Sequence, residues 1–167
     1  MTYLPFDLHP EYPAEGIPRE QLNARYGEPF HDRLRQTFEA NGVAYAPPPD
    51  VVPRTVDALR LTELARDWEV HEAFHDRLMD AYWQEGANIG DHDVLRALAA
   101  EVGLPDDGVE RVLRGDDYAQ RVAVSTQQAA SIGASGIPAF VLNGKVLILG
   151  AQPHEVFERA LTQIATS

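Results

Sequence analysis

The chain has 167 residues, of which 44% are hydrophobic and 24% are charged. This length and composition predict one globular domain with a real hydrophobic core, and they exclude an intrinsically disordered protein. The formal net charge of -12 argues against nucleic acid or an anionic membrane surface as a binding partner.

Cysteine is absent from the sequence. Disulfide bonds, thiolate zinc sites and thiol chemistry are therefore excluded for these residues on their own. No apolar run approaches the roughly 20 residues that a membrane span needs. The N-terminus shows neither the basic region nor the apolar core of a secretory signal. We expect a cytoplasmic protein, and we expect no cofactor.

The N-terminal part of the chain predicts one short strand followed by helices. Residues 2–8 suit a strand, and Pro5 would confine it to a sheet edge or a strand start. Residues 9–18 hold three prolines and one glycine and are predicted as a loop. Two helices are then predicted, over residues 19–26 and 28–41.

The middle of the chain is predicted to be helical throughout. Apolar residues repeat there at helical spacing. Asp91 is placed to cap one helix and Gly103 to end it. The predicted helices cover residues 55–68, 70–84, 91–102, 106–113 and 116–132.

Strand patterns return only near the C-terminus. Residues 139–143 and 145–151 are predicted strands, and Asn143-Gly144 between them is the strongest short hairpin pattern. Pro153 suits the first turn of a final helix over residues 154–165. Because the strand regions lie at opposite ends of the chain, we expect an α/β fold whose small sheet is interrupted by a large all-helical insertion.

Short patches along the chain resemble one known family in their order and spacing. The patches are Pro5-Phe6-Asp7-Leu8-His9-Pro10-Glu11, Val52-Pro53-Arg54-Thr55-Val56, Phe74-His75-Asp76-Arg77-Leu78, Gly136-Ile137-Pro138-Ala139-Phe140 and Gly150-Ala151-Gln152-Pro153. Together they resemble the DsbA-like thioredoxin domain, in particular its FrnE-type branch. The resemblance implies a single domain over residues 1–167, with a thioredoxin core of residues 1–12 and 136–167 around a helical insertion of residues 18–134.

The sequence departs from the pattern of that family. Family members begin with a strand and a Cys-x-x-Cys at a helix start, so we expect a thioredoxin-like sheet without its first strand. Arg54 stands where related isomerases and transferases often carry Asn. The first strand is central in such a sheet. We therefore expect residues 2–8 to pair with residues 139–143, or the open edge to dimerise or to accept a strand from another polypeptide.

The candidate binding residues lie in the segment that resembles the cis-proline loop of the family. The resemblance implies a cis bond before Pro138 and a substrate-binding loop of Gly136, Ile137 and Pro138. In that loop the Ile137 backbone would pair with an extended peptide or thiol ligand. Arg54 and Thr55 are candidates for an adjoining groove, although Thr55 is also explained as a helix cap. A turn that only sets the strand direction is the alternative, and no catalytic residue is assigned.

The segment His71-Glu72-Ala73-Phe74-His75 matches the His-Glu-x-x-His pattern of zinc hydrolases. On a helix this spacing puts both imidazoles on one face, with the Glu beside them as general base. A catalytic zinc also needs a third protein ligand, and the sequence marks none. We expect a partly exposed surface pair and assign no metal site.

Three hypotheses for the function follow. The first is a thiol–disulfide oxidoreductase of the DsbA family, truncated or redox-inactive as written, so whether the chain is an enzyme stays open. The second is a non-catalytic thioredoxin-like module that binds a peptide or a partner. The third is a zinc hydrolase that uses His71, Glu72 and His75. We expect a polypeptide or thiol substrate and a homodimer or strand-completing partner, and neither nucleic acid nor a membrane.

Overall fold

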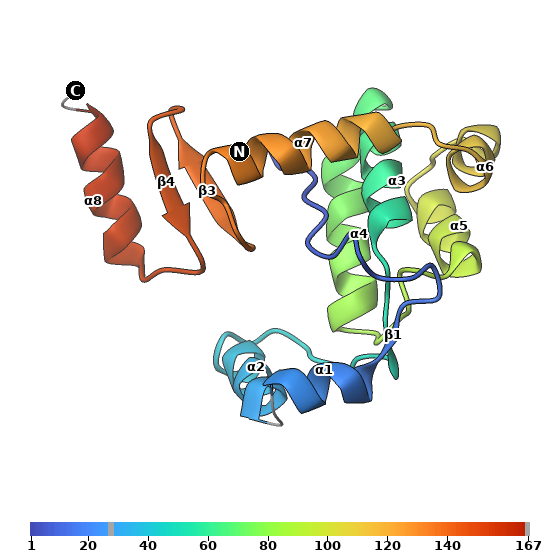
Figure 1. The fold of residues 1–167 in the computed structure, drawn as a ribbon, viewed down its shortest axis with the longest axis horizontal. Coiled ribbons are helices and arrows are strands. Elements are labelled where there is room, and N and C mark those ends of the chain that lie inside the picture. Colours follow the sequence, from blue (N-terminus) through green and yellow to red (C-terminus); the bar gives the residue numbers. More distant parts are fainter. Residues whose placement is uncertain (27–28, 166–167) are drawn as a thin grey trace.

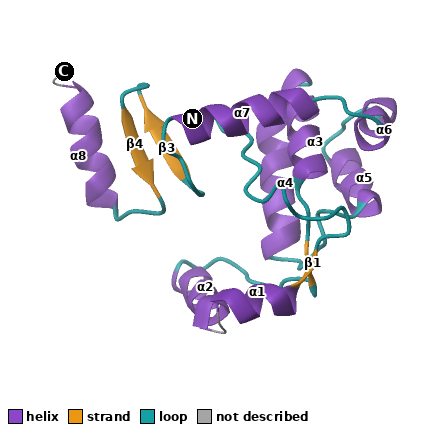
Figure 2. Cartoon of the chain, in the orientation of Figure 1, coloured by secondary structure: helices purple, strands orange, loops and turns teal. Residues whose placement is uncertain are grey.

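The computed structural model describes residues 1–26 and 29–165, most of them in helices (Figure 2). The predicted helix over residues 28–41 begins with Glu28, which lies outside the described residues. The helices are α1 (Arg19–Tyr26), α2 (Pro29–Ala40), α3 (Val56–Asp67), α4 (His71–Trp83), α5 (His92–Glu101), α6 (Asp106–Arg114), α7 (Ala119–Ser131) and α8 (His154–Ala165). The strands are β1 (Ile17–Pro18), β2 (Val51–Val52), β3 (Ala139–Leu142) and β4 (Val146–Leu149).

The main hydrophobic core lies among α3, α4, α5 and α6. Each of these helices buries one apolar stripe, and their largest buried side chains include Leu61, Phe74, Leu95 and Val112. Apolar residues three or four positions apart share a helix face, so the sequence pattern fixes which face turns inward. Figure 1 shows α3 and α4 side by side, with α5 and α6 next to them and α7 crossing α3.

The ends of α5 follow the predicted capping. The Asp91 side chain accepts a hydrogen bond from the Asp93 N–H at 2.8 Å. Gly103 follows the helix with a φ of +78°. The start of α7 differs from the prediction, because Asp116 lies before the helix and the helix begins at Ala119. Tyr118 separates them with a φ of +66°, a left-handed backbone that interrupts helical geometry.

Residues 2–8 form no strand, so the prediction of a strand there is wrong. The predicted pairing of residues 2–8 with residues 139–143 is also wrong. The segment is instead held by side chains of helices. The Asp7 N–H donates to Thr126 Oγ1 of α7 at 2.9 Å, and Arg66 Nη2 of α3 donates to the Tyr3 carbonyl at 2.6 Å. These contacts satisfy backbone groups that a sheet would otherwise have to pair.

The strands form two separate antiparallel pairs. β1 pairs with β2, a contact that the sequence did not predict, and β3 pairs with β4. Asn143 and Gly144 have φ values of +50° and +65°, and the Lys145 N–H donates to the Leu142 carbonyl at 3.0 Å. Two successive positive φ values are the signature of the type I′ turn, so the predicted hairpin is confirmed.

The β3–β4 hairpin and α8 form a small unit of their own. The Phe140 and Phe157 rings meet edge to face at 5.0 Å, and Ile148 and Ala160 are buried. Figure 1 shows this unit set off from the helices α3–α6, which α7 joins to it. Among the described elements, the extensive contacts of β3 are with β4 and α8. No helix in the described part of the chain is both long and apolar enough to cross a bilayer.

Candidate functional site

The loop of Gly136, Ile137 and Pro138 joins the end of α7 to β3. Its Ile137–Pro138 peptide bond is cis. The Pro138 carbonyl accepts a hydrogen bond from the Gly150 N–H at 2.8 Å, which ties the loop to the end of β4. Ile137 is 61% exposed, although isoleucine is a residue that folding normally buries. The loop therefore presents an apolar side chain at the surface, in a bend that directly precedes β3.

The edge of β3 that faces away from β4 has no strand beside it. The register pairs Ala139 with Leu149 and Val141 with Leu147. The Gly150 N–H bonds to the Pro138 carbonyl, so the next pair along the ladder, Ala139 and Leu149, exchanges no hydrogen bonds. Such pairs alternate along an antiparallel ladder, so Val141 and Leu147 also exchange none. The N–H and C=O groups of Ala139 and Val141 therefore point away from β4. In the described part of the chain, no other strand pairs with them.

The hairpin has one covered and one uncovered face. Phe140 and Ile148 point toward α8. Strand side chains alternate between faces, so Val141 and Leu149 point to the opposite side. They are 50% and 42% exposed, and the described helices leave them uncovered. The uncovered face continues the apolar surface that begins at Ile137.

The stretch from Ser135 to Pro153 carries one charged residue, Lys145 at the turn of the hairpin. This low charge contrasts with the formal net charge of -12 for the chain. An apolar surface with almost no charge is typical of a place where another polypeptide binds.

Arg54 and Thr55 lie in the loop between β2 and α3, on the helical part of the molecule. Thr55 occupies the N-cap position of α3, but its side chain makes no capping hydrogen bond. A Cβ atom at Gly90 would lie 3.2 Å from the Arg54 carbonyl, which places Arg54 against the loop before α5. In the described residues, no hydrogen bond or ion pair joins Arg54 or Thr55 to the loop at Gly136–Pro138.

His71 and His75 occupy the first turns of α4, and Tyr3 covers them. The Tyr3 ring stacks on His75 at 4.7 Å, and the two imidazoles stack at 6.1 Å. Arg66 Nη2 lies 2.8 Å from His71 Nε2 and donates to it, so this ring nitrogen already has a partner. Burial, followed by the charge of Arg66, lowers the pKa of His71. Within residues 1–26 and 29–165, no group of three His, Asp or Glu side chains comes together as zinc ligands.

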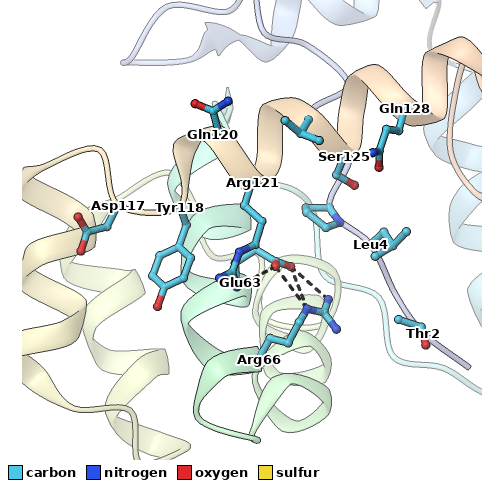
Figure 3. A pocket seen from close by; sticks show the side chains of 12 residues that line it. Thr2, Leu4, Glu63, Arg66, Asp117, Tyr118, Gln120, Arg121, Ser125 and Gln128 are labelled. Carbon is cyan, nitrogen blue, oxygen red and sulfur yellow. Dashed lines mark hydrogen bonds and ion pairs between the residues drawn. The ribbon is translucent and has the colours of Figure 1, made fainter.

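An open groove of about 840 Å³ lies between the N-terminal segment, α3 and α7 (Figure 3). On its floor Glu63 is buried, with Arg66 at 3.1 Å and Arg121 at 3.5 Å. Arg121 also pairs with Asp67 at 2.8 Å, and this hydrogen bond is the main reason that the pKa of Asp67 is lowered. The sequence analysis missed this groove. Its acidic and basic groups neutralise one another, so the groove has no strong preference for either charge.

Comparison with known proteins identifies the family. The model of the DSBA-like thioredoxin domain matches residues 1–162. The chain belongs to this family. The DSBA-like domain is similar to the uncharacterized protein YwbO of Bacillus subtilis (strain 168), with 28% identity over 170 residues, 97% of this chain and 80% of YwbO.

Solved structures agree with the family. The crystal structure of SCO1869 from Streptomyces coelicolor, described as a probable DsbA oxidoreductase, has 34% identity and a TM-score of 0.84, covering 95% of this chain and 72% of SCO1869. The second structure is that of a protein from Nitrosomonas europaea assigned as a protein disulfide isomerase. It has 21% identity and a TM-score of 0.55, and the match covers 70% of this chain and 59% of the Nitrosomonas chain. The second likeness concerns the fold alone. The thioredoxin-like fold with a helical insertion is confirmed, and the FrnE-type branch stays a prediction.

Proposed function

We propose that this DSBA-like domain binds an extended polypeptide at the loop of Gly136, Ile137 and Pro138. One observation carries the proposal. Ile137 is exposed at the end of an open strand edge, and in the described residues no hydrogen bond occupies its N–H or C=O group. An extended peptide that passes the loop would pair with these backbone groups and cover the Ile137 side chain.

The domain supplies no thiol to such a polypeptide from its own residues. Thiol–disulfide exchange needs a thiolate that attacks a disulfide sulfur, and the sequence contains no cysteine. The loop would thus act as the substrate clamp of a DsbA-family reaction whose cysteines lie outside these 167 residues or on the bound polypeptide. The resemblance to SCO1869 over 95% of the chain supports this relationship to an oxidoreductase.

A pair of matched variants tests the clamp. Ile137→Asp places a carboxylate on the loop, and Leu161→Asp places one on α8, where Leu161 is similarly exposed at 55%. The probe is a fluorescent acetylated Val-Thr-Val tripeptide amide, measured by anisotropy. We expect Ile137→Asp to weaken binding about tenfold, because the bound apolar ligand would remove water from the new carboxylate. We expect Leu161→Asp to leave binding unchanged.

Two results would contradict the proposal. The first is a wild-type chain that does not bind the tripeptide at millimolar concentration. The second is an equal loss of affinity in both variants, since that would report the added charge and not the loop. A disulfide-exchange assay completes the test, and in it the chain alone should not change the rate above the uncatalysed reaction.

A further inference from the structure

The chain contains two Asn-Gly dipeptides, Asn41-Gly42 after α2 and Asn143-Gly144 in the turn between β3 and β4. Asparagine is a chemically labile residue. A following glycine makes it more so, because the glycine nitrogen can approach the side-chain carbonyl without a Cβ atom in the way. All four residues are exposed to solvent, so exposure does not distinguish the two dipeptides. Their hydrogen bonds do.

Two hydrogen bonds hold Asn41-Gly42 at the end of α2. Asn41 Nδ2 donates to the Thr37 carbonyl at 2.7 Å, and the Gly42 N–H donates to the Glu39 carbonyl at 3.1 Å. An attack of the Gly42 nitrogen on the Asn41 side chain needs both groups to turn toward each other. Both hydrogen bonds must therefore break first, which makes the reactive arrangement rare.

Asn143-Gly144 has neither of these restraints. In the described part of the chain, no hydrogen bond engages the Asn143 side chain or the Gly144 N–H. The turn is closed by the bond from the Lys145 N–H to the Leu142 carbonyl. It lies at the tip of a two-stranded hairpin, and such a small hairpin is only marginally stable. Its tip opens more readily than the end of a helix, so the reactive arrangement is reached more often at Asn143.

We propose that Asn143 is a site of spontaneous deamidation and that the fold protects Asn41 from the same reaction. The Gly144 nitrogen loses its proton to hydroxide and forms a bond to Cγ of Asn143. The bond between Cγ and Nδ2 breaks, and the leaving nitrogen takes up protons from water and departs as ammonia. Water then opens the resulting cyclic succinimide at either carbonyl group, which gives aspartate or isoaspartate. This inference is independent of peptide binding at the loop before β3.

The isoaspartate product would disrupt the hairpin. Its main chain runs through Cβ, which adds a carbon atom to the backbone between residues 143 and 144. The type I′ turn depends on the positive φ values of both residues, so a longer backbone cannot keep its geometry. The neighbouring pair Leu142 and Val146 should open first. The aspartate product keeps an ordinary backbone and should keep the hairpin.

Peptide mapping by mass spectrometry tests the proposal on the full chain, aged at mildly alkaline pH. It follows both dipeptides in the same molecules, so Asn41 is the internal control. We expect Asn143 to be converted at least about tenfold faster than Asn41. In urea that unfolds the chain, the hydrogen bonds at Asn41 are lost, and the difference should fall below about threefold.

Two results of this experiment would overturn the proposal. The first is a conversion of Asn41 in the folded chain that is as fast as that of Asn143. The second is a tenfold difference that persists in urea, because the folded structure would then not be its cause.

The effect on the hairpin is measured by hydrogen exchange. The isoaspartate form is separated by chromatography and compared with Asn143→Asp, which carries the same charge on an ordinary backbone. We expect residues 139–149 to exchange faster in the isoaspartate form, whereas α3–α6 exchange alike in both. Equal exchange in residues 139–149 would refute the disruption of the hairpin. Should Asn143→Asp not fold, the unaged chain serves as the reference.

Discussion

Arg66 donates a hydrogen bond to His71, with 2.8 Å between Nη2 and Nε2. A guanidinium group has no acceptor atom, so His71 Nε2 must accept and the ring carries its proton on Nδ1. The same Arg66 nitrogen donates to the Tyr3 carbonyl. A single nitrogen atom of α3 thus links the start of α4 to the N-terminal segment, and it requires that His71 be neutral.

Acidification should weaken this contact. Burial and the neighbouring Arg66 and His75 lower the pKa of His71 below its usual 6.5 in the folded chain. Near pH 6.5 and below, the unfolded chain therefore binds the His71 proton more readily than the folded chain does. The free energy of unfolding decreases as the pH falls from about 6.5 toward the lowered pKa of His71. His71→Gln keeps an acceptor for Arg66 and does not titrate. We expect it to lose less stability than the wild type between pH 7.5 and 5 in urea titrations.

An equal pH dependence in His71→Gln and the wild type would show that His71 does not contribute. The direct check is the imidazole titration followed by NMR. A midpoint for His71 at or above that of an unstructured histidine peptide would contradict the expected direction.

Replacing Arg60 should strongly destabilise the helical core. The guanidinium is 6% exposed and donates to the Asp117 and Gly115 carbonyls, each at 2.8 Å, and to Asp57 at 2.8 Å. Arg60→Met removes three hydrogen bonds at once, although Asp57 keeps His92 as a partner at 2.8 Å, and we expect a loss of about 1–3 kcal/mol. Arg114→Met is the control, because Arg114 lies on core helix α6 with a side chain that is 77% exposed. Urea unfolding followed by tryptophan fluorescence measures both variants. A loss below about 1 kcal/mol for Arg60→Met would contradict the assignment.

Phe74 should be the most sensitive apolar position of α4. Its side chain is fully buried among α3, α4 and α5, so Phe74→Ala opens a cavity and should lower the free energy of unfolding by about 3–5 kcal/mol. Met79 on the same helix is exposed, and Met79→Ala should cost about 0.5 kcal/mol or less. Equal effects of the two substitutions in thermal unfolding would mean that the core is placed wrongly.

Alanine substitutions at Gly86 and Gly103 distinguish the cost of a left-handed backbone from the cost of a steric clash. Both have positive φ values, +68° and +78°. A Cβ atom at Gly86 would lie 2.6 Å from the Pro47 carbonyl, whereas nothing lies within 4 Å at Gly103. Gly103→Ala should therefore cost only the left-handed backbone, about 1–2 kcal/mol. Gly86→Ala should cost at least about 1 kcal/mol more in urea unfolding, and equal costs would exclude the close contact.

Local patterns predicted the elements of this fold that depend on local physics. The hairpin at Asn143-Gly144 and the cap at Asp91 need only the residues beside them, and the structure has both. The segment of residues 2–8 was misjudged because a strand requires a partner. Its backbone instead meets Arg66 and Thr126, which lie far away in the sequence.

The groove between the N-terminal segment, α3 and α7 also depends on contacts between residues that are distant in the sequence. Glu63 and Arg66 are neighbours on one helix face, and their spacing in the sequence reveals that pair. Arg121 joins them from α7 through tertiary packing, for which no local pattern exists. The loop at Gly136–Pro138 was predicted because its residues are contiguous in the sequence.

The separation of the β3–β4–α8 unit from the helical core has a consequence for cooperativity. The two tryptophans, Trp68 and Trp83, both lie at the ends of core helices, and α8 and the hairpin contain none. Indole emission therefore reports on one part of the chain and is blind to the other. Because few contacts couple the two parts, we expect two separate melting events and no single transition temperature.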